Sequence, residues 1–187
     1  MKKIVITGGL GYIGTELCKI YSGHSWNDKI TVIDNRFISE RVNQIRNWNM
    51  DFVQGDILDK ELIKKHCSDA DIIHHLAGIT DVPRVKSQSN ADNDKKIIEV
   101  AQEGTQNILD VMKDDCKIVM PSTHVVFEGL TTVKKNLDET TEPKPILEYS
   151  KSKFESEKDI IHSDKNYVII RLGSCLLYTS PSPRDNR

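Results

Sequence analysis

A cluster of glycines near the N-terminus has the position and composition of a phosphate-binding turn. Gly8, Gly11 and Gly14 follow the apolar run 4–6 and open a stretch of helical periodicity. A turn without Cβ atoms lets a pyrophosphate approach the backbone, and a helix N-terminus offers unpaired N–H groups and the positive end of its dipole. A glycine-rich match alone is weak, because glycines occur in any tight turn. With a strand before it and a helix after it, this turn predicts a dinucleotide site.

Acidic residues after the next two apolar runs would complete such a site. Asp34 comes twenty residues after Gly14, where a carboxylate accepts hydrogen bonds from the adenosine ribose hydroxyls and repels a 2′-phosphate. Arg36 either offers a partner to that phosphate or is a solvated loop charge. Asp56 either meets the adenine amino group or caps the helix that follows. We therefore expect NAD as the cofactor in preference to NADP.

A tyrosine and a lysine in the second half of the chain are spaced for proton transfer. A phenol with a pKa of about 10 is a poor base at neutral pH unless a cation stabilises the phenolate. Lys153 lies one helical turn after Tyr149, so it shares a helix face with the phenol and its charge can lower the phenol pKa. The same spacing arises by chance in many chains, in which the tyrosine packs an amphipathic helix and the lysine is solvated.

The elements that would position these side chains follow from an alternation of short Ile- and Val-rich runs with longer segments of helical period. Strands are predicted at residues 4–7, 29–34, 51–54, 71–75, 117–121 and 167–172. Helices are predicted at residues 12–21, 39–47, 59–67, 90–113 and 149–162. Apolar strands separated by helices form a parallel sheet that is covered on both faces. The predicted fold class is α/β, a doubly wound parallel sheet, and the polar stretch 127–146 reads as a long surface loop.

The composition excludes several classes of function. The 187 residues carry 26 Lys and Arg against 28 Asp and Glu, for a net charge of −2 and no basic stripe, so neither nucleic acid nor a membrane is expected as a partner. The first residues form a strand pattern instead of a signal-peptide core, and we expect a cytoplasmic protein. The cysteines lack the spacing of a zinc site, so no metal site is expected. They are Cys18, Cys67, Cys116 and Cys175.

Six short motifs occur in a recognisable order. They are TGGLGYIG (7–14), VIDN (32–35), GDI (55–57), HLAG (75–78), PST (121–123) and YSKSK (149–153). In this order they resemble the extended short-chain dehydrogenase/reductases, the NAD-dependent epimerase/dehydratase family, with its UDP-glucose 4-epimerase-like members. The resemblance covers residues 2–174. It implies an NAD(P)-binding Rossmann fold and a nucleotide-sugar substrate.

The resemblance also implies roles for single residues. Tyr149 would take the substrate's hydroxyl proton, Lys153 would hold the nicotinamide ribose and lower the phenol pKa, and Thr123 would share the reacting oxygen. His124 is expected to be incidental. The implied cofactor-binding residues are Gly8, Gly11, Tyr12, Ile13, Gly14, Asp34, Asn35, Asp56, Ile57, Leu76, Ala77, Gly78, Tyr149 and Lys153.

Departures from the family pattern narrow the expected reaction. In the family's 4,6-dehydratases an Asp-Glu pair follows the catalytic Thr, but His124 and Val125 follow Thr123 here. A helix segment that usually reads Asn-Val-x-Gly-Thr reads AQEGT, with Ala101 in place of the Asn. An epimerase that oxidises and re-reduces one sugar carbon through a transient ketone fits best. The alternatives are an NAD(P)-dependent sugar dehydrogenase or reductase and a non-catalytic dinucleotide-binding sensor.

The last residues depart from the family pattern altogether. CLLYTSPSPRD (175–185) resembles one reading frame of a transposase-type sequencing adapter, and the alternative is a native Pro-rich linker. We expect residues 1–174 to form the NAD-binding domain with the catalytic Tyr and Lys, and 175–187 to be a non-native tail. The chain would then be an N-terminal fragment without the C-terminal substrate domain, inactive as it stands. The full-length form would be a homodimer.

Overall fold

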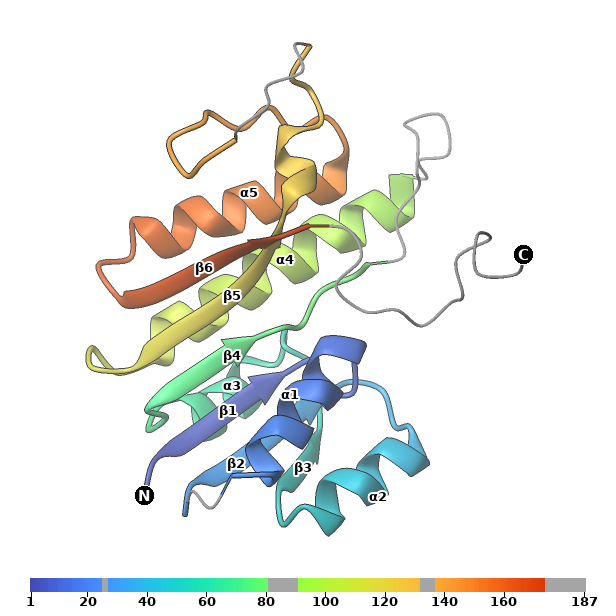
Figure 1. The fold of residues 1–187 in the computed structure, drawn as a ribbon, viewed down its shortest axis with the longest axis vertical. Coiled ribbons are helices and arrows are strands. Elements are labelled where there is room, and N and C mark those ends of the chain that lie inside the picture. Colours follow the sequence, from blue (N-terminus) through green and yellow to red (C-terminus); the bar gives the residue numbers. More distant parts are fainter. Residues whose placement is uncertain (25–26, 81–90, 132–136, 174–187) are drawn as a thin grey trace.

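A computed structural model describes residues 1–24, 27–80, 91–131 and 137–173 (Figure 1). The strands are β1 (Lys3–Thr7), β2 (Lys29–Asp34), β3 (Asp51–Gln54), β4 (Ile72–His75), β5 (Lys117–Thr123) and β6 (Asn166–Leu172). The helices are α1 (Tyr12–Ser22), α2 (Ser39–Asn47), α3 (Lys60–Cys67), α4 (Ala91–Val111) and α5 (Glu148–Ile161), with a 3-10 turn η2 (His124–Phe127). The predicted tail 175–187 lies outside the described residues.

All pairings within the described sheet are parallel, and its strand order is β3-β2-β1-β4-β5-β6. Strands β2 and β3 lie on one side of β1, and strands β4, β5 and β6 lie on its other side. In such sheets ligands bind beyond the carboxyl ends of the strands, at the point where the order reverses. The predicted doubly wound α/β fold is confirmed, and its switch point lies between β1 and β4.

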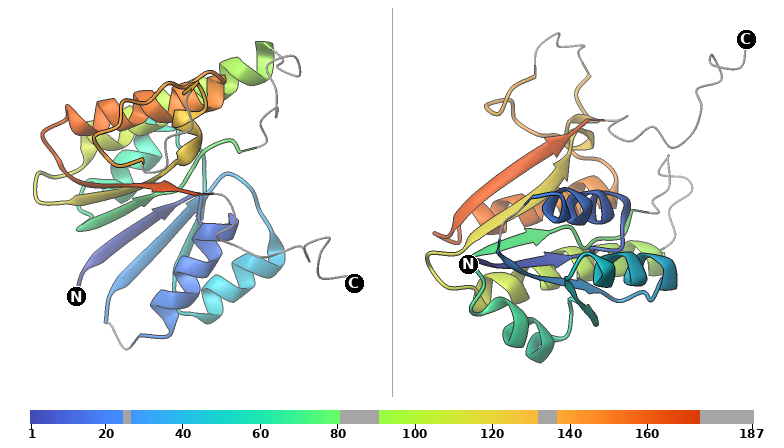
Figure 2. Two further views of the ribbon diagram at one scale, coloured as in Figure 1. Left: turned by 45° about the horizontal axis from the view of Figure 1, so that its top comes forward. Right: turned by 60° about the horizontal axis from the view of Figure 1, so that its bottom comes forward.

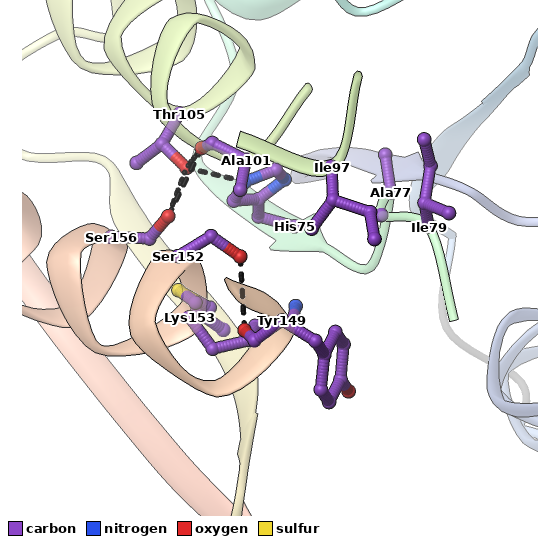
Figure 3. A pocket seen from close by; sticks show the side chains of 12 residues that line it. His75, Ala77, Ile79, Ile97, Ala101, Thr105, Tyr149, Ser152, Lys153 and Ser156 are labelled. Carbon is purple, nitrogen blue, oxygen red and sulfur yellow. Dashed lines mark hydrogen bonds between the residues drawn. The ribbon is translucent and has the colours of Figure 1, made fainter. Parts of the chain in front are cut away.

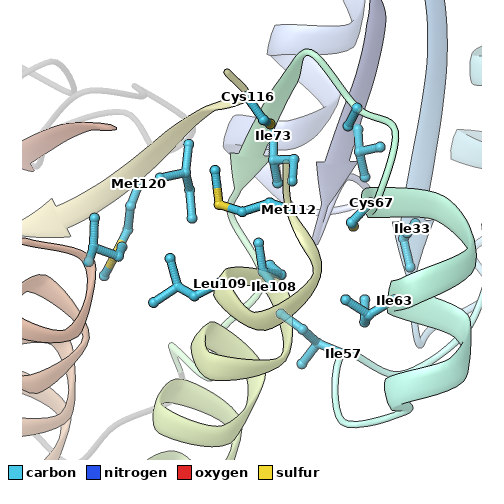
Figure 4. Close-up of a cluster of buried hydrophobic side chains, with 14 of the residues drawn as sticks. Ile33, Ile57, Ile63, Cys67, Ile73, Ile108, Leu109, Met112, Cys116 and Met120 are labelled. Carbon is cyan, nitrogen blue, oxygen red and sulfur yellow. The ribbon is translucent and has the colours of Figure 1, made fainter. Parts of the chain in front are cut away.

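Two layers of helices cover the sheet (Figure 2). Successive residues of β1 point to opposite faces, because the side-chain period of a strand is two. Val5 joins a buried cluster with residues of α3, α4 and α5, whereas Ile4 and Ile6 pack with residues of α1 and α2. The larger cluster, in which Ile108 of α4 and Ile63 of α3 are fully buried, is drawn in Figure 4. Burial of this apolar surface is the main stabilising contribution to the fold.

The structure differs from the sequence-based expectations in places. The strand β5 extends to Thr123, so this residue ends the strand instead of following it. The cap of α3 is Asp59, whose carboxylate accepts from the Leu62 N–H at 3.1 Å, so the alternative of Asp56 as helix cap was wrong. Full coverage of the sheet was also wrong at its edge strand β6, where Val168 and Ile170 are 40% and 45% exposed.

No helix in the described part of the chain combines the length and the apolar character that crossing a bilayer requires.

A buried ion pair joins α5 to β6. Glu157 is 1% exposed, and the Arg171 guanidinium lies against its carboxylate in a bidentate arrangement, with Nη2 to Oε2 at 2.6 Å and Nε to Oε1 at 3.1 Å. The guanidinium carbon also lies 5.2 Å from the centre of the Phe127 ring. A buried carboxylate is tolerated only when such a partner compensates its lost hydration.

Removal of this partner should therefore destabilise the fold. We expect Arg171→Met to lower the free energy of unfolding by about 3–5 kcal/mol, because it leaves Glu157 buried and unpaired. Adding Glu157→Leu to the same chain should restore most of the loss. Urea unfolding would measure both, with Lys158→Met as control, since Lys158 pairs with Glu155 at the surface and should cost less than about 1 kcal/mol. Equal losses in Arg171→Met and Lys158→Met would contradict the assigned role.

Candidate cofactor and catalytic site

The glycine turn between β1 and α1 packs so closely that side chains are excluded from two of its positions. Gly8 has a φ of 68°, and a Cβ there would lie 2.6 Å from the Ala77 backbone nitrogen. A Cβ on Gly14 would lie 2.5 Å from the Cα of Gly9. Both contacts are with backbone, which cannot give way. Gly8 thus packs against the segment that follows β4, and Gly14 packs the first turn of α1 against the glycine turn itself.

Gly11 differs from these two glycines because its missing side chain faces outward. A Cβ there would meet only the Gly8 carbonyl oxygen, at 3.2 Å. Gly11 is also the N-cap of α1 and makes no side-chain cap, so the first N–H groups of the helix lack an intrahelical acceptor. Tyr12 and Ile13 in the same turn are 63% and 42% exposed. This cradle fits a pyrophosphate: it has open space, free donors and the positive end of the helix dipole.

Asp34 at the end of β2 fixes the turn from the side. It is 4% exposed, and its Oδ2 accepts from the Leu10 N–H at 3.0 Å. Its Oδ1 accepts from the backbone N–H and the Nε of Arg36, at 3.0 and 3.3 Å. A carboxylate offers about four acceptor sites, so one remains for a ribose hydroxyl. The exposed guanidinium of Arg36 pairs with Asp34 in this arrangement.

The neighbouring predicted residues form a second small group. The Asn35 side chain donates to Asp56 Oδ2 at 3.1 Å, and Asp56 Oδ1 accepts from the Leu58 N–H at 3.0 Å. Both residues therefore lie beside Asp34, at the carboxyl end of the sheet. Ile57 is buried in the core, where a Cβ on Gly104 would lie 2.9 Å from its side chain.

Tyr149 and Lys153 line one pocket together with Ala77 and Gly78 at the end of β4 (Figure 3). The Lys153 ammonium donates to the Pro121 carbonyl of β5 at 3.4 Å, and a Cβ on Gly78 would lie 3.5 Å from the same Nζ. Burial lowers the pKa of Lys153 from 10.5 to about 8, against an opposing effect of the Glu157 charge. The structure thus brings the β4 end and the Tyr-Lys pair of α5 together, although these segments are far apart in the sequence.

The structure differs from what we expected of the Tyr149 pKa and of the position of Thr123. Burial raises the pKa of the Tyr149 phenol, so the expected lowering by Lys153 is not present in this arrangement, in which the ammonium contacts a carbonyl instead. Thr123 does not line the pocket around Tyr149. Its Oγ1 accepts from the Val125 N–H at 3.1 Å and so caps η2, which leaves the hydroxyl proton available to donate.

A buried polar network behind the pocket was not foreseen from the sequence. His75 is 3% exposed, and its two ring nitrogens lie 3.2 Å from Thr7 Oγ1 and 3.0 Å from Thr105 Oγ1. Burial and the Lys153 charge lower the pKa of His75 to about 3, so the imidazole is neutral. Thr105 and Ser156 both donate to the Ala101 carbonyl, at 2.5 and 3.0 Å. The network links β1, β4, α4 and α5, and no residue spacing in the sequence indicates it.

Comparison with known proteins shows the family to which the chain belongs. The sequence profile of the 3-beta hydroxysteroid dehydrogenase/isomerase family matches residues 5–180. The chain belongs to this family. The expected membership of the extended short-chain dehydrogenase/reductases, the NAD-dependent epimerase/dehydratase enzymes, is thereby confirmed.

Several relatives are similar over most of the chain. A dTDP-D-glucose 4,6-dehydratase from Dictyostelium discoideum is 28% identical over 93% of this chain, and a CDP-paratose 2-epimerase from Salmonella typhi is 31% identical over 74%. The chain spans 39% and 41% of the length of these two relatives. Among solved structures, a UDP-Glc/GlcNAc 4-epimerase from Campylobacter jejuni has a TM-score of 0.75 at 22% identity, covering 98% of this chain and 59% of its own. A UDP-glucose 4-epimerase from Brucella ovis in complex with NAD has a TM-score of 0.73 at 23% identity, covering 91% and 51%.

The burial of Lys153 predicts how stability depends on pH. Below its pKa of about 8 the ammonium is charged in the folded and unfolded states, and burial of this charge costs stability. Between about 8 and 10.5 the unfolded chain binds the proton more than the folded chain, so this cost disappears as the pH rises. The free energy of unfolding of the original chain should therefore rise relative to that of Lys153→Met over this range, as measured by urea unfolding.

The matched control is Lys151→Met, because the Lys151 ammonium pairs with Glu148 at the surface, at 2.6 Å. The free energy of unfolding of the original chain should not rise relative to that of Lys151→Met over that pH range. A Lys153→Met series that runs parallel to the Lys151→Met series would show that burial does not act on Lys153.

Proposed function

We propose that this chain is the cofactor-binding and catalytic part of an NAD-dependent nucleotide-sugar epimerase. The observation that carries the proposal is the pocket shared by Tyr149, Lys153 and Gly78, at the carboxyl end of β4 and beside the glycine turn. A phenol, a cation and an open backbone edge therefore meet at the switch point of a doubly wound sheet, where dinucleotides bind. The relatives named for nucleotide-sugar epimerases and dehydratases support the substrate class.

The residues present fit the parts of such a reaction. The turn around Gly11 would hold the pyrophosphate, and Asp34 would accept from the adenosine ribose. When bound, NAD supplies a hydride acceptor. Tyr149 would remove the hydroxyl proton from the sugar carbon that becomes a ketone and return it when the carbon is reduced on its other face. Lys153 would hold the nicotinamide ribose and stabilise the phenolate, and Thr123 would donate to the reacting oxygen.

Three other functions would use the same fold differently. A sugar dehydrogenase or reductase would need the same Tyr149 and Lys153 but would release its reduced or oxidised cofactor after each turnover. A dinucleotide-binding sensor would need the glycine turn without either side chain, so the presence of both in one pocket favours an enzyme. A 4,6-dehydratase would need an acid and a base after Thr123, where His124 and Val125 stand.

Cofactor titration tests the first half of the proposal. We expect the chain to bind NAD at least about tenfold more tightly than NADP, because a 2′-phosphate would face the buried Asp34 carboxylate. Gly11→Val should abolish binding of both, because its side chain would occupy the space of the pyrophosphate. Its Cβ would lie 3.2 Å from the Gly8 carbonyl oxygen, which is a close contact, so the melting temperature is measured alongside to show that the variant is folded. The control is Gly23→Val at the other end of α1, where φ is −78° and the nearest atom to a Cβ lies at 3.6 Å. Isothermal calorimetry that finds equal affinity for NAD and NADP would refute the assignment of Asp34.

Hydride transfer tests the second half. In a longer form of the protein that includes a substrate domain, with NAD and UDP-glucose present, we expect the absorbance of reduced nicotinamide to appear transiently. Tyr149→Phe should slow its appearance by about 100-fold to 10,000-fold with little change in NAD affinity. Lys153→Met should slow hydride transfer and also weaken NAD binding. Thr123→Val should cost less than Tyr149→Phe, because it removes one hydrogen bond and leaves the base in place. A Tyr149→Phe chain that transfers hydride at the original rate would exclude Tyr149 as the base.

A further inference from the structure

The helix that carries Tyr149 and Lys153 starts without a cap of its own. The N-cap of α5 is Leu147, whose side chain makes no cap hydrogen bond. The N–H groups at a helix N-terminus need acceptors, and they favour a negative charge. In this structure one carboxylate from a distant segment places a negative charge there and accepts from the two N–H groups just before the helix.

That carboxylate belongs to Glu128, which is half-buried just after η2. Its Oε1 accepts from the Ile146 N–H at 2.8 Å and from the Leu147 N–H at 2.7 Å. It also accepts from the Ser150 hydroxyl, in the first turn of α5. Hydrogen bonds to an ionised acceptor are stronger than neutral ones, so three donors on a single oxygen tie Glu128 firmly to the start of the helix.

The backbone beside Glu128 is joined to the same segment. The Lys144 N–H donates to the Val126 carbonyl at 2.8 Å, and the Gly129 N–H donates to the Lys144 carbonyl at 2.8 Å. The two segments approach so closely that a Cβ on Gly129 would touch the Lys144 carbonyl oxygen. Residues 126–129 and 144–147 therefore form one packed unit.

This unit lies between two of the residues to which we assign chemistry. On one side, Thr123 caps η2, and Glu128 is the C-cap residue of that turn. On the other side, Tyr149 is in the first turn of the helix that Glu128 holds. We propose that Glu128 is a positioning residue, which fixes the start of α5 and thereby the Tyr149 side chain relative to Thr123. The inference rests on the proposed function for the roles of Tyr149 and Thr123.

The test compares two variants of Glu128 in the full chain labelled with 3-fluorotyrosine. The Tyr149 fluorine resonance is identified by its loss in Tyr149→Phe. Glu128→Gln keeps an oxygen that accepts from the N–H groups, so it should retain the original Tyr149 resonance and NAD affinity. Glu128→Ala removes the acceptor, so it should shift or split this resonance. It should also weaken NAD binding by about tenfold, because Lys153 on the same helix would be displaced together with Tyr149. The exposed Glu139 gives the matched control, Glu139→Ala, which should change neither.

A Glu128→Ala chain that melts at a lower temperature but keeps the original Tyr149 resonance while folded would overturn the inference, because Glu128 would then only cap a helix. Should Glu128→Ala fail to fold, Ser150→Ala removes one of the three donors and should shift the resonance in the same direction; an unchanged resonance there would again overturn it. The fluorine signal needs no cofactor. A chain that binds no NAD would therefore refute the proposed function while the resonance still decides the role of Glu128.

Discussion

The close contact between the glycine turn and the end of β4 is the constraint on which the rest of this site depends. Gly8 takes a positive φ, and the Ala77 backbone occupies the space where its Cβ would be. Any side chain at Gly8 would push apart the two strands that flank the switch point of the sheet. Because the strands stay together, the start of α1 and the pocket of Lys153 lie at the same carboxyl-terminal edge of the sheet. The cost is a turn that only glycine can form.

Two carboxylates attach α5 to its surroundings, one from outside the helix and one on the helix itself. Glu128 reaches its N-terminus from the segment after β5, and Glu157 near its C-terminal half reaches Arg171 on β6. Tyr149 and Lys153 lie between these two attachments. A helix fixed at one end only could still pivot, whereas two attachments to different parts of the sheet edge set its rotation as well as its position. The roles that we propose for Tyr149 and Lys153 would require this precision, because a catalytic side chain must lie within hydrogen-bond distance of its substrate.

The sequence predicted the features that depend on local pattern. The spacing of Gly8, Gly11 and Gly14 and the alternation of apolar runs were sufficient to predict the fold and the tight turn before α1, because both follow from backbone sterics and side-chain period. Contacts between segments that are far apart in the sequence could not be predicted from it. Glu128 stands in a polar stretch that reads only as a surface loop, and nothing in its neighbours indicates that it contacts residues 146–150. The network of His75 likewise depends on partners from other elements, which only the folded chain brings within hydrogen-bond distance.

Burial shifts the pKa values of the two ionisable groups of the pocket in opposite directions and so moves them apart. Burial raises the pKa of Tyr149 and lowers that of Lys153 to about 8, because both charged forms are poorly solvated there. At neutral pH the phenol is therefore protonated and the ammonium charged, but the ammonium contacts the Pro121 carbonyl, 3.4 Å away. A neutral His75 behind the pocket adds no competing charge. Any ligand that draws the Lys153 ammonium from Pro121 toward the phenol would lower the phenol pKa, so the binding of that ligand itself would prepare the base.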